Sequence, residues 1–160
     1  MKKTVLIVDD DRAVRNSIRK VLELAGYEVS AAADGDQASV FFDPDKIDLV
    51  LLDLNLPLES GWDVFERLST RFPLVPVIII TGMAGQYPTA QAAGVSAFME
   101  KPVAAPVLLK TLNEVLAEPR KTLLRRMCGR QHDTRHLPAP KPPANGHSAQ
   151  PALHYHRGTL

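Results

Sequence analysis

Five short apolar runs recur along the first 116 residues and alternate with segments of helical periodicity. The runs are rich in Val, Ile and Leu and alternate little between apolar and polar side chains. That pattern is typical of strands that are buried on both faces of a sheet. We therefore predict strands at residues 4–8, 28–32, 48–52, 77–80 and 97–99.

The segments between these runs repeat their apolar residues every three or four positions, which predicts helices. Local signals mark several ends: Gly26 stops the first helix, Asp34 and Gln37 form a capping-box pattern, and Ser60 precedes a helix as a cap. The predicted helices cover residues 12–25, 35–42, 61–71, 88–93 and 106–116. Strands that alternate with helices predict an α/β fold with a parallel sheet covered on both faces.

The chain changes character after residue 116. Residues 1–116 carry 11 Lys/Arg and 16 Asp/Glu, a net charge of −5, whereas residues 117–160 carry 8 and 2, a net charge of +6. We assign residues 1–118 to one domain and expect residues 119–131 to be able to extend its last helix. Residues 132–160 contain five prolines and few large apolar groups, so we expect a disordered, Pro-rich basic tail.

The composition also bears on the compartment. The single cysteine, Cys128, cannot form an intrachain disulfide, which favours a reducing compartment. The apolar stretch near the start has five residues, too few for a secretory signal, and no run approaches the roughly 18 apolar residues of a membrane span. We therefore expect a cytoplasmic protein without a membrane segment.

Polar residues follow the ends of four predicted strands. Asp9 and Asp10 follow the first, Asp53 the third, Thr81 the fourth and Lys101 the fifth. In a doubly wound parallel sheet, ligands bind outside the carboxyl ends of the strands, so these side chains should converge. Carboxylates that lie close together repel and therefore call for a cation, and oxygen ligands of this kind suit Mg²⁺. A carboxylate beside Mg²⁺, an ammonium and a hydroxyl fits nucleophilic attack on a phosphoryl group.

Each of these residues also has a simpler reading when it is taken alone. The run Asp9–Asp11 could only cap the first helix, Asp53 and Thr81 could be turn residues, and Lys101 could be a solvated lysine. Their joint occurrence at matching strand ends favours the site, with Asp11 as the helix cap. The five histidines all lie after residue 131 and are interpreted as solvated side chains.

The segments VLIVDDD, LVLLDLNLP…G, VIIITG, AGVSAFMEKP and the final Leu-rich helix resemble, in this order, the receiver domain of bacterial response regulators. The resemblance covers residues 3–116 and implies a flavodoxin-like (βα)5 fold with strand order 2-1-3-4-5. It implies that Asp53 is the phosphorylated aspartate. The roles implied for the other residues are metal ligation by Asp9, Asp10, Asp53 and the backbone carbonyl of Asn55, phosphate contact by Thr81 and Lys101, and a conformational switch formed by Thr81 and Phe98.

Two departures from the common family pattern concern the switch region. Phe98 stands where tyrosine is frequent, and the segment from Thr81 to Lys101 is shorter than usual, which predicts a short or irregular fourth helix. Phe98 is also compatible with a plain core position.

The resemblance implies a signalling module that is not an enzyme in the metabolic sense. It would accept a phosphoryl group from a histidine kinase or phosphotransfer protein, with self-catalysed phosphorylation and dephosphorylation, and then switch the binding of a protein partner as a monomer or a phosphorylation-dependent dimer. Residues 117–160, with six prolines, leave no room for a helix-turn-helix domain. We therefore expect a stand-alone receiver or a phosphorelay member that contacts nucleic acid, if at all, through its basic tail.

Two other classes of protein share part of this pattern. Phosphatases of the haloacid dehalogenase class also form an aspartyl phosphate with Mg²⁺, but they need a second acid two residues after the nucleophile, where this chain has Asn55. A dinucleotide-binding Rossmann protein is excluded because acids, not a glycine-rich turn, follow the first strand.

Overall fold

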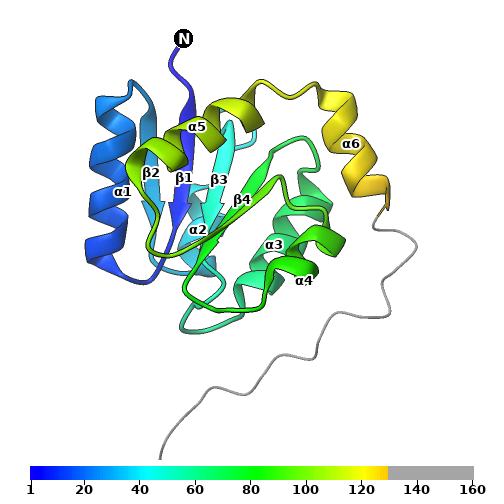
Figure 1. Cartoon of the computed structure of the whole chain (residues 1–160), viewed down its shortest axis with the longest axis horizontal. Coiled ribbons are helices and arrows are strands. Elements are labelled where there is room, and N and C mark those ends of the chain that lie inside the picture. Colours follow the sequence, from blue (N-terminus) through cyan, green and yellow to red (C-terminus); the bar gives the residue numbers. More distant parts are fainter. Residues whose placement is uncertain (130–160) are drawn as a thin grey trace, which may run out of the picture.

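A parallel five-stranded sheet organises the protein, whose computed structural model describes residues 1–129 (Figure 1). The strand order is β2-β1-β3-β4-β5, and every neighbouring pair is parallel. The strands are β1 (Thr4–Val8), β2 (Glu28–Ala32), β3 (Leu49–Leu52), β4 (Val77–Thr81) and β5 (Ala97–Glu100). The predicted α/β class, the five strands and the order 2-1-3-4-5 are confirmed.

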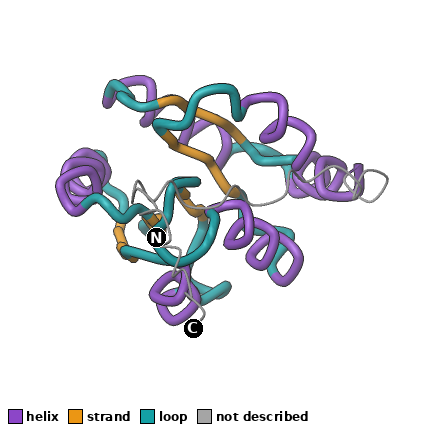
Figure 2. The backbone as a smooth tube through the Cα atoms, turned by 90° about the horizontal axis from the view of Figure 1, so that it is seen from below, coloured by secondary structure: helices purple, strands orange, loops and turns teal. Residues whose placement is uncertain are grey.

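Six helices surround this sheet within the described residues. They are α1 (Arg12–Leu24), α2 (Gly35–Phe41), α3 (Gly61–Arg71), α4 (Tyr87–Ala93), α5 (Ala105–Leu116) and α6 (Arg120–Gly129). Helices α2, α3 and α4 contribute to the apolar core on one face of the sheet, and α1 and α5 to the core on the other. Figure 2 shows the strands lying between these helical layers.

Alternate residues of each central strand enter the two cores. In β1, Leu6 and Val8 pack toward α2, α3 and α4, whereas Val5 and Ile7 pack toward α1 and α5. All four side chains are almost fully buried, as are the four residues of β3. Burial of each such side chain stabilises the fold by roughly 1.5–3 kcal/mol, which explains why these strands are apolar without alternation.

Local caps fix where the helices begin. Asp11 accepts hydrogen bonds from the backbone N–H groups of Ala13 and Val14 at 2.8 and 3.2 Å, so it caps α1 as expected. Asp34 accepts from the Gln37 N–H at 2.8 Å, and Ser60 accepts from the Trp62 N–H at 3.2 Å. Because each cap directly follows the loop after a strand, it also fixes the geometry of that loop.

The segment after α5 differs from the expectation for residues 119–131. It does not extend α5: the helix ends at Leu116, and a separate helix α6 begins at Arg120. Pro119 explains the break, because its ring cannot occupy a helix interior without clashing with the preceding turn. Leu123 is buried and anchors α6, and Arg126 forms an ion pair with Glu118. The remainder of this segment and the expected tail at 132–160 lie outside the described residues.

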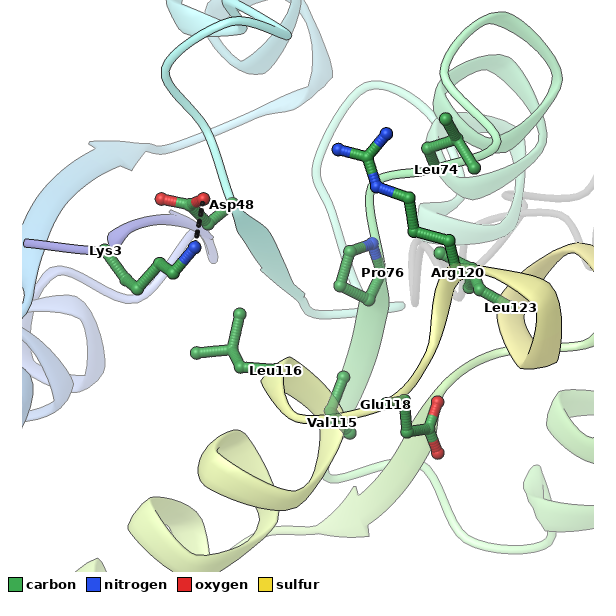
Figure 3. A pocket seen from close by; sticks show the side chains of 9 residues that line it. All are labelled: Lys3, Asp48, Leu74, Pro76, Val115, Leu116, Glu118, Arg120 and Leu123. Atoms are coloured by element: carbon green, nitrogen blue, oxygen red, sulfur yellow. Dashed lines mark hydrogen bonds and ion pairs between the residues drawn. The ribbon is translucent and has the colours of Figure 1, made fainter. Parts of the chain in front are cut away.

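A cavity of about 190 Å³ lies where α6 meets the amino ends of the strands (Figure 3). Lys3 and Asp48 form an ion pair of 3.3 Å on one side of it, and Glu118 and Arg120 line the other. Three of the lining residues directly precede strands: Lys3 precedes β1, Asp48 precedes β3 and Pro76 precedes β4. This cavity is therefore at the opposite end of the sheet from the predicted site. Within residues 1–129, no helix is both long and apolar enough to cross a bilayer.

Candidate functional site

The carboxyl ends of four strands bring together the polar residues that the sequence singled out. Asp9 and Asp10 follow β1, Asp53 follows β3, Thr81 ends β4, and Lys101 follows β5. This is the edge marked by the strand arrowheads in Figure 1. Parallel strands all present their carboxyl ends on one edge, which is why residues as far apart as 9 and 101 can meet.

Lys101 joins the two most buried carboxylates of the group. Its Nζ lies 2.6 Å from Oδ2 of Asp9 and 2.8 Å from Oδ2 of Asp53. Asp9 and Asp53 are only 3% and 4% exposed, so the charges interact more strongly than those of an ion pair on the surface. One ammonium thus bridges β1 and β3 from the end of β5.

The second oxygen of each carboxylate is held by the backbone of its own loop. Oδ1 of Asp9 accepts a hydrogen bond from the Asp11 N–H at 2.9 Å, and Oδ1 of Asp53 accepts one from the Asn55 N–H at 3.0 Å. Both side chains are therefore fixed from two directions. Such fixed orientation is what a positioned nucleophile or metal ligand requires.

Burial and neighbouring charges shift the pKa values of Asp9 and Lys101. Burial raises the pKa of Asp9 above its ordinary value; hydrogen bonds from Lys101 and Asp11 oppose this, and the nearby charge of Asp53 adds to it. Burial lowers the pKa of Lys101, but its hydrogen bonds to Asp53 and Asp9 outweigh this, and the pKa is raised overall. The ammonium therefore stays charged at neutral pH, while the hydrogen bonds to Asp9 do not fully offset the cost of burying that carboxylate.

The donor set fits a divalent cation. Carboxylate oxygens from Asp9, Asp10 and Asp53 all lie within 4.8 Å of one another, and Asp10 is exposed to solvent. Hard oxygen donors from few carboxylates, with an open side for water, are the arrangement that Mg²⁺ prefers. Asn55 lines the same open cavity of about 430 Å³, which also includes Asp11, Gly82, Met83 and Lys101.

Thr81 and Phe98 occupy different surroundings. Thr81 is fully buried, and its Oγ1 accepts a hydrogen bond from the Met83 N–H at 3.2 Å. Phe98 does not line the cavity; it packs against the core beside α4, with the ring of Tyr87 edge-on at 5.9 Å between ring centroids. Thr81 thus ends β4 directly before Gly82 and Met83, which line the cavity, but neither Thr81 nor Phe98 lines it.

Gly61 is a site residue whose role the sequence reasoning missed, although it lies within a quoted motif. A Cβ at this position would lie 2.3 Å from the carbonyl oxygen of Asp53 and 2.5 Å from Cα of Leu54. The Gly61 N–H also donates to the Leu54 carbonyl at 2.9 Å. The start of α3 can thus approach the backbone of Asp53 only because residue 61 has no side chain.

This fold and this cluster of residues define an α/β domain with an acidic candidate cation site at the carboxyl edge of its sheet, and comparison with known proteins specifies the family. The response regulator receiver domain family model matches residues 5–113. The chain therefore belongs to the response regulator receiver domain family.

The curated relatives agree with the family. Response regulator MprA of Mycolicibacterium vanbaalenii is 35% identical over 118 residues, which is 72% of this chain and 51% of the relative. Its counterpart in Mycobacterium bovis is 34% identical over the same shares of the two chains. The chain thus spans about half the length of the curated relatives it matches.

Solved structures agree as well. The CheY-like response regulator receiver domain protein of Methanospirillum hungatei is similar with a TM-score of 0.68 and 33% identity, covering 72% of this chain and 94% of that one. The receiver domain from Clostridium thermocellum has a TM-score of 0.68 and 31% identity, covering 76% and 98%.

Proposed function

We propose that this receiver takes a phosphoryl group onto Asp53 from a histidine kinase or phosphotransfer protein, and that the transfer switches the binding of a protein partner. The observation that carries the proposal is the Asp53 carboxylate itself. It is 4% exposed, fixed by the Asn55 N–H, paired with Lys101, and within 4.8 Å of two further acids.

In the proposed step, a carboxylate oxygen of Asp53 attacks phosphorus in line with the bond to the donor. A P–O bond to Asp53 forms while the bond to the donor nitrogen, or to the oxygen of an acyl phosphate, breaks and its electron pair leaves with the donor. Mg²⁺ held by Asp9, Asp10, Asp53 and the backbone carbonyl of Asn55 would neutralise charge on the phosphoryl oxygens. Lys101 is placed to transfer its contact from Asp53 to a phosphoryl oxygen.

Thr81 supplies the proposed link between phosphorylation and shape. Its hydroxyl is turned onto its own loop, where it accepts from the Met83 N–H. A phosphoryl group on Asp53 offers that hydroxyl a charged acceptor, and its movement would carry the loop inward and alter the surroundings of Phe98. Thr81→Ala should then permit labelling but weaken the conformational response, with a loss of coupling of about 1–3 kcal/mol.

We propose a signalling role and not turnover of an external substrate. A haloacid dehalogenase-type phosphatase is disfavoured because Asn55 replaces the acid that would protonate the leaving group. We further propose a protein partner, with the receiver acting alone or in a phosphorelay as a monomer or phosphorylation-dependent dimer. The cytoplasm is the proposed place of action, since the single cysteine favours a reducing compartment.

Incubation with acetyl phosphate, followed by intact mass spectrometry, tests the proposal. The mass should rise by one phosphoryl group with Mg²⁺ and not with EDTA. Asp53→Asn should abolish the gain. Asp45→Asn, an exposed acid that precedes β3 and so lies at the other end of that strand from Asp53, is the matched control that should keep it. Equal labelling of the Asp53→Asn variant would remove the basis of the assignment.

A further inference from the structure

The loop between β4 and α4 forms one wall of the site. Thr81 begins it, and Gly82 and Met83 line the cavity that contains Asp53. Gly85 has a φ of +73°, and a Cβ at Gly82 or Gly85 would meet nothing within 4 Å. The loop therefore bends sharply and has free space around its bends, so its position depends on what holds its far end.

That far end is tied to α3. Gln86 stands at the N-cap position of α4, yet its side chain makes no capping hydrogen bond. Its Oε1 instead accepts a hydrogen bond from the indole Nε1 of Trp62 at 3.2 Å. The Gln86 side chain therefore joins the start of α4 to α3 and does not cap its own helix.

Trp62 is itself held close to Asp53. Trp62 follows Gly61, which packs against the Asp53 backbone. The backbone N–H of Trp62 donates to the Ser60 hydroxyl at 3.2 Å. Its ring meets Phe65 edge-on, with centroids 6.0 Å apart. The indole is thus held in place at the start of α3, next to the Asp53 backbone, and the Gln86 side chain is hydrogen-bonded to it.

We propose that Trp62 is a positioning residue that latches the β4–α4 loop in its resting place, and that the loop must release Gln86 before Thr81 can reach a phosphoryl group. This inference rests on the proposed function of Asp53. Two observations support a resting latch: the Thr81 hydroxyl is engaged with Met83, and Tyr87, the residue after Gln86, lies edge-on to Phe98. Release of the latch would free both contacts together.

The expected effect follows from the strength of one hydrogen bond. A bond that favours the resting state reduces the population of the reactive state, and apparent reactivity falls with that population. The usual net strength of a single neutral hydrogen bond corresponds to about a three- to tenfold change in that population. Removal of the latch should raise the rate of Asp53 labelling by acetyl phosphate by this factor.

The experiment uses the full chain with Trp62→Phe, Gln86→Leu, the double variant, and Gln86→Glu, which keeps an acceptor oxygen. Phenylalanine keeps an aromatic ring beside Phe65 but lacks the indole N–H and the second ring, so Gln86→Leu, which leaves the indole in place, separates loss of the hydrogen bond from loss of volume. Urea unfolding of each variant verifies that it is folded. Both single variants should label faster, the double variant should match a single one, and Gln86→Glu should restore the wild-type rate.

Fluorescence gives an independent readout, because Trp62 is the only tryptophan in the sequence. Its emission in the wild type should change on phosphorylation with the same time course as the mass gain. Unchanged or slower labelling in both single variants, or effects that multiply in the double variant, would overturn the latch. Failure of the wild type to label at all would instead overturn the proposed function.

Discussion

Lys101 contacts both buried carboxylates of the site, and its removal should expose the electrostatic cost of gathering them. In Lys101→Met, a side chain of similar length keeps the packing but removes the ammonium that lies 2.6 Å from Asp9 and 2.8 Å from Asp53. Two carboxylates that are almost fully buried then face one another without compensation. We expect a less stable but folded protein.

The magnitude follows from the burial of the three side chains. Removal of one partner from a fully buried ion pair costs about 3–5 kcal/mol. The Lys101 side chain is 23% exposed, and water can enter from the open cavity, so the cost should fall at or just below the lower end of this range. We expect a decrease of about 2–3 kcal/mol in the free energy of unfolding at neutral pH without Mg²⁺.

The pH dependence gives the sharper test. The pKa of Asp9 is already raised above its ordinary value of 3.8 by burial, and loss of the Lys101 hydrogen bond would raise it further. The folded protein then binds a proton more tightly than the unfolded chain, so stability rises as the pH falls from neutral toward that ordinary value. The difference in free energy of unfolding between the wild type and Lys101→Met should therefore shrink as Asp9 becomes protonated.

At alkaline pH the wild type should lose the contribution of Lys101 to its free energy of unfolding, whereas the variant has no such contribution to lose. The folded pKa of Lys101 is raised above its ordinary value of 10.5, so its contribution is present below that pH and is lost as the pH rises through the folded pKa. Urea unfolding in EDTA across the pH range measures both effects. A deficit that is constant from acid to alkaline pH, or no deficit at all, would refute the electrostatic account.

Three further predictions concern the cation site, the Asp53 loop and the end of the chain. Asp10→Asn should raise the free energy of unfolding in EDTA by about 1 kcal/mol, because it removes repulsion between carboxylates that lie within 4.8 Å of one another. Mg²⁺ should raise the melting temperature of the wild type but not that of this variant. Gly61→Ala should cost about 3 kcal/mol in urea unfolding, because its Cβ would overlap the Asp53 carbonyl; a loss below 1 kcal/mol would contradict the close approach. A chain that ends at Gly129 should melt within a few degrees of the full chain and still label, because the last buried core residue described is Leu123; unfolding on truncation would contradict this.

The strands and the site's main residues could be predicted because they depend on local signals. Buried parallel strands are apolar throughout, so β1 and β3 are visible as runs, and the residue after each run must lie at the sheet edge. Asp9, Asp53 and Lys101 are therefore visible from the sequence as a group, although their functional roles remain proposals. The strand order came from the resemblance, because apolar runs do not specify which strands are neighbours.

Other features were not visible because they depend on contacts between distant loops. Trp62 and Gln86 are 24 positions apart, and nothing in either segment signals that the Trp62 indole N–H donates to the Gln86 side chain. The role of Gly61 depends on how closely α3 approaches Asp53, which only coordinates reveal. The separate helix α6 was missed because its residues continue the apolar spacing of α5, although Pro119 marks the break.

The central claim is that Asp53, and no neighbouring acid, receives the phosphoryl group. Reduction of the labelled protein with borohydride converts an aspartyl phosphate into homoserine, and peptide mass spectrometry then identifies the modified position. The account predicts homoserine at position 53 alone, and only in samples labelled with Mg²⁺. Homoserine at Asp9 or Asp10, or equal modification in EDTA, would contradict it.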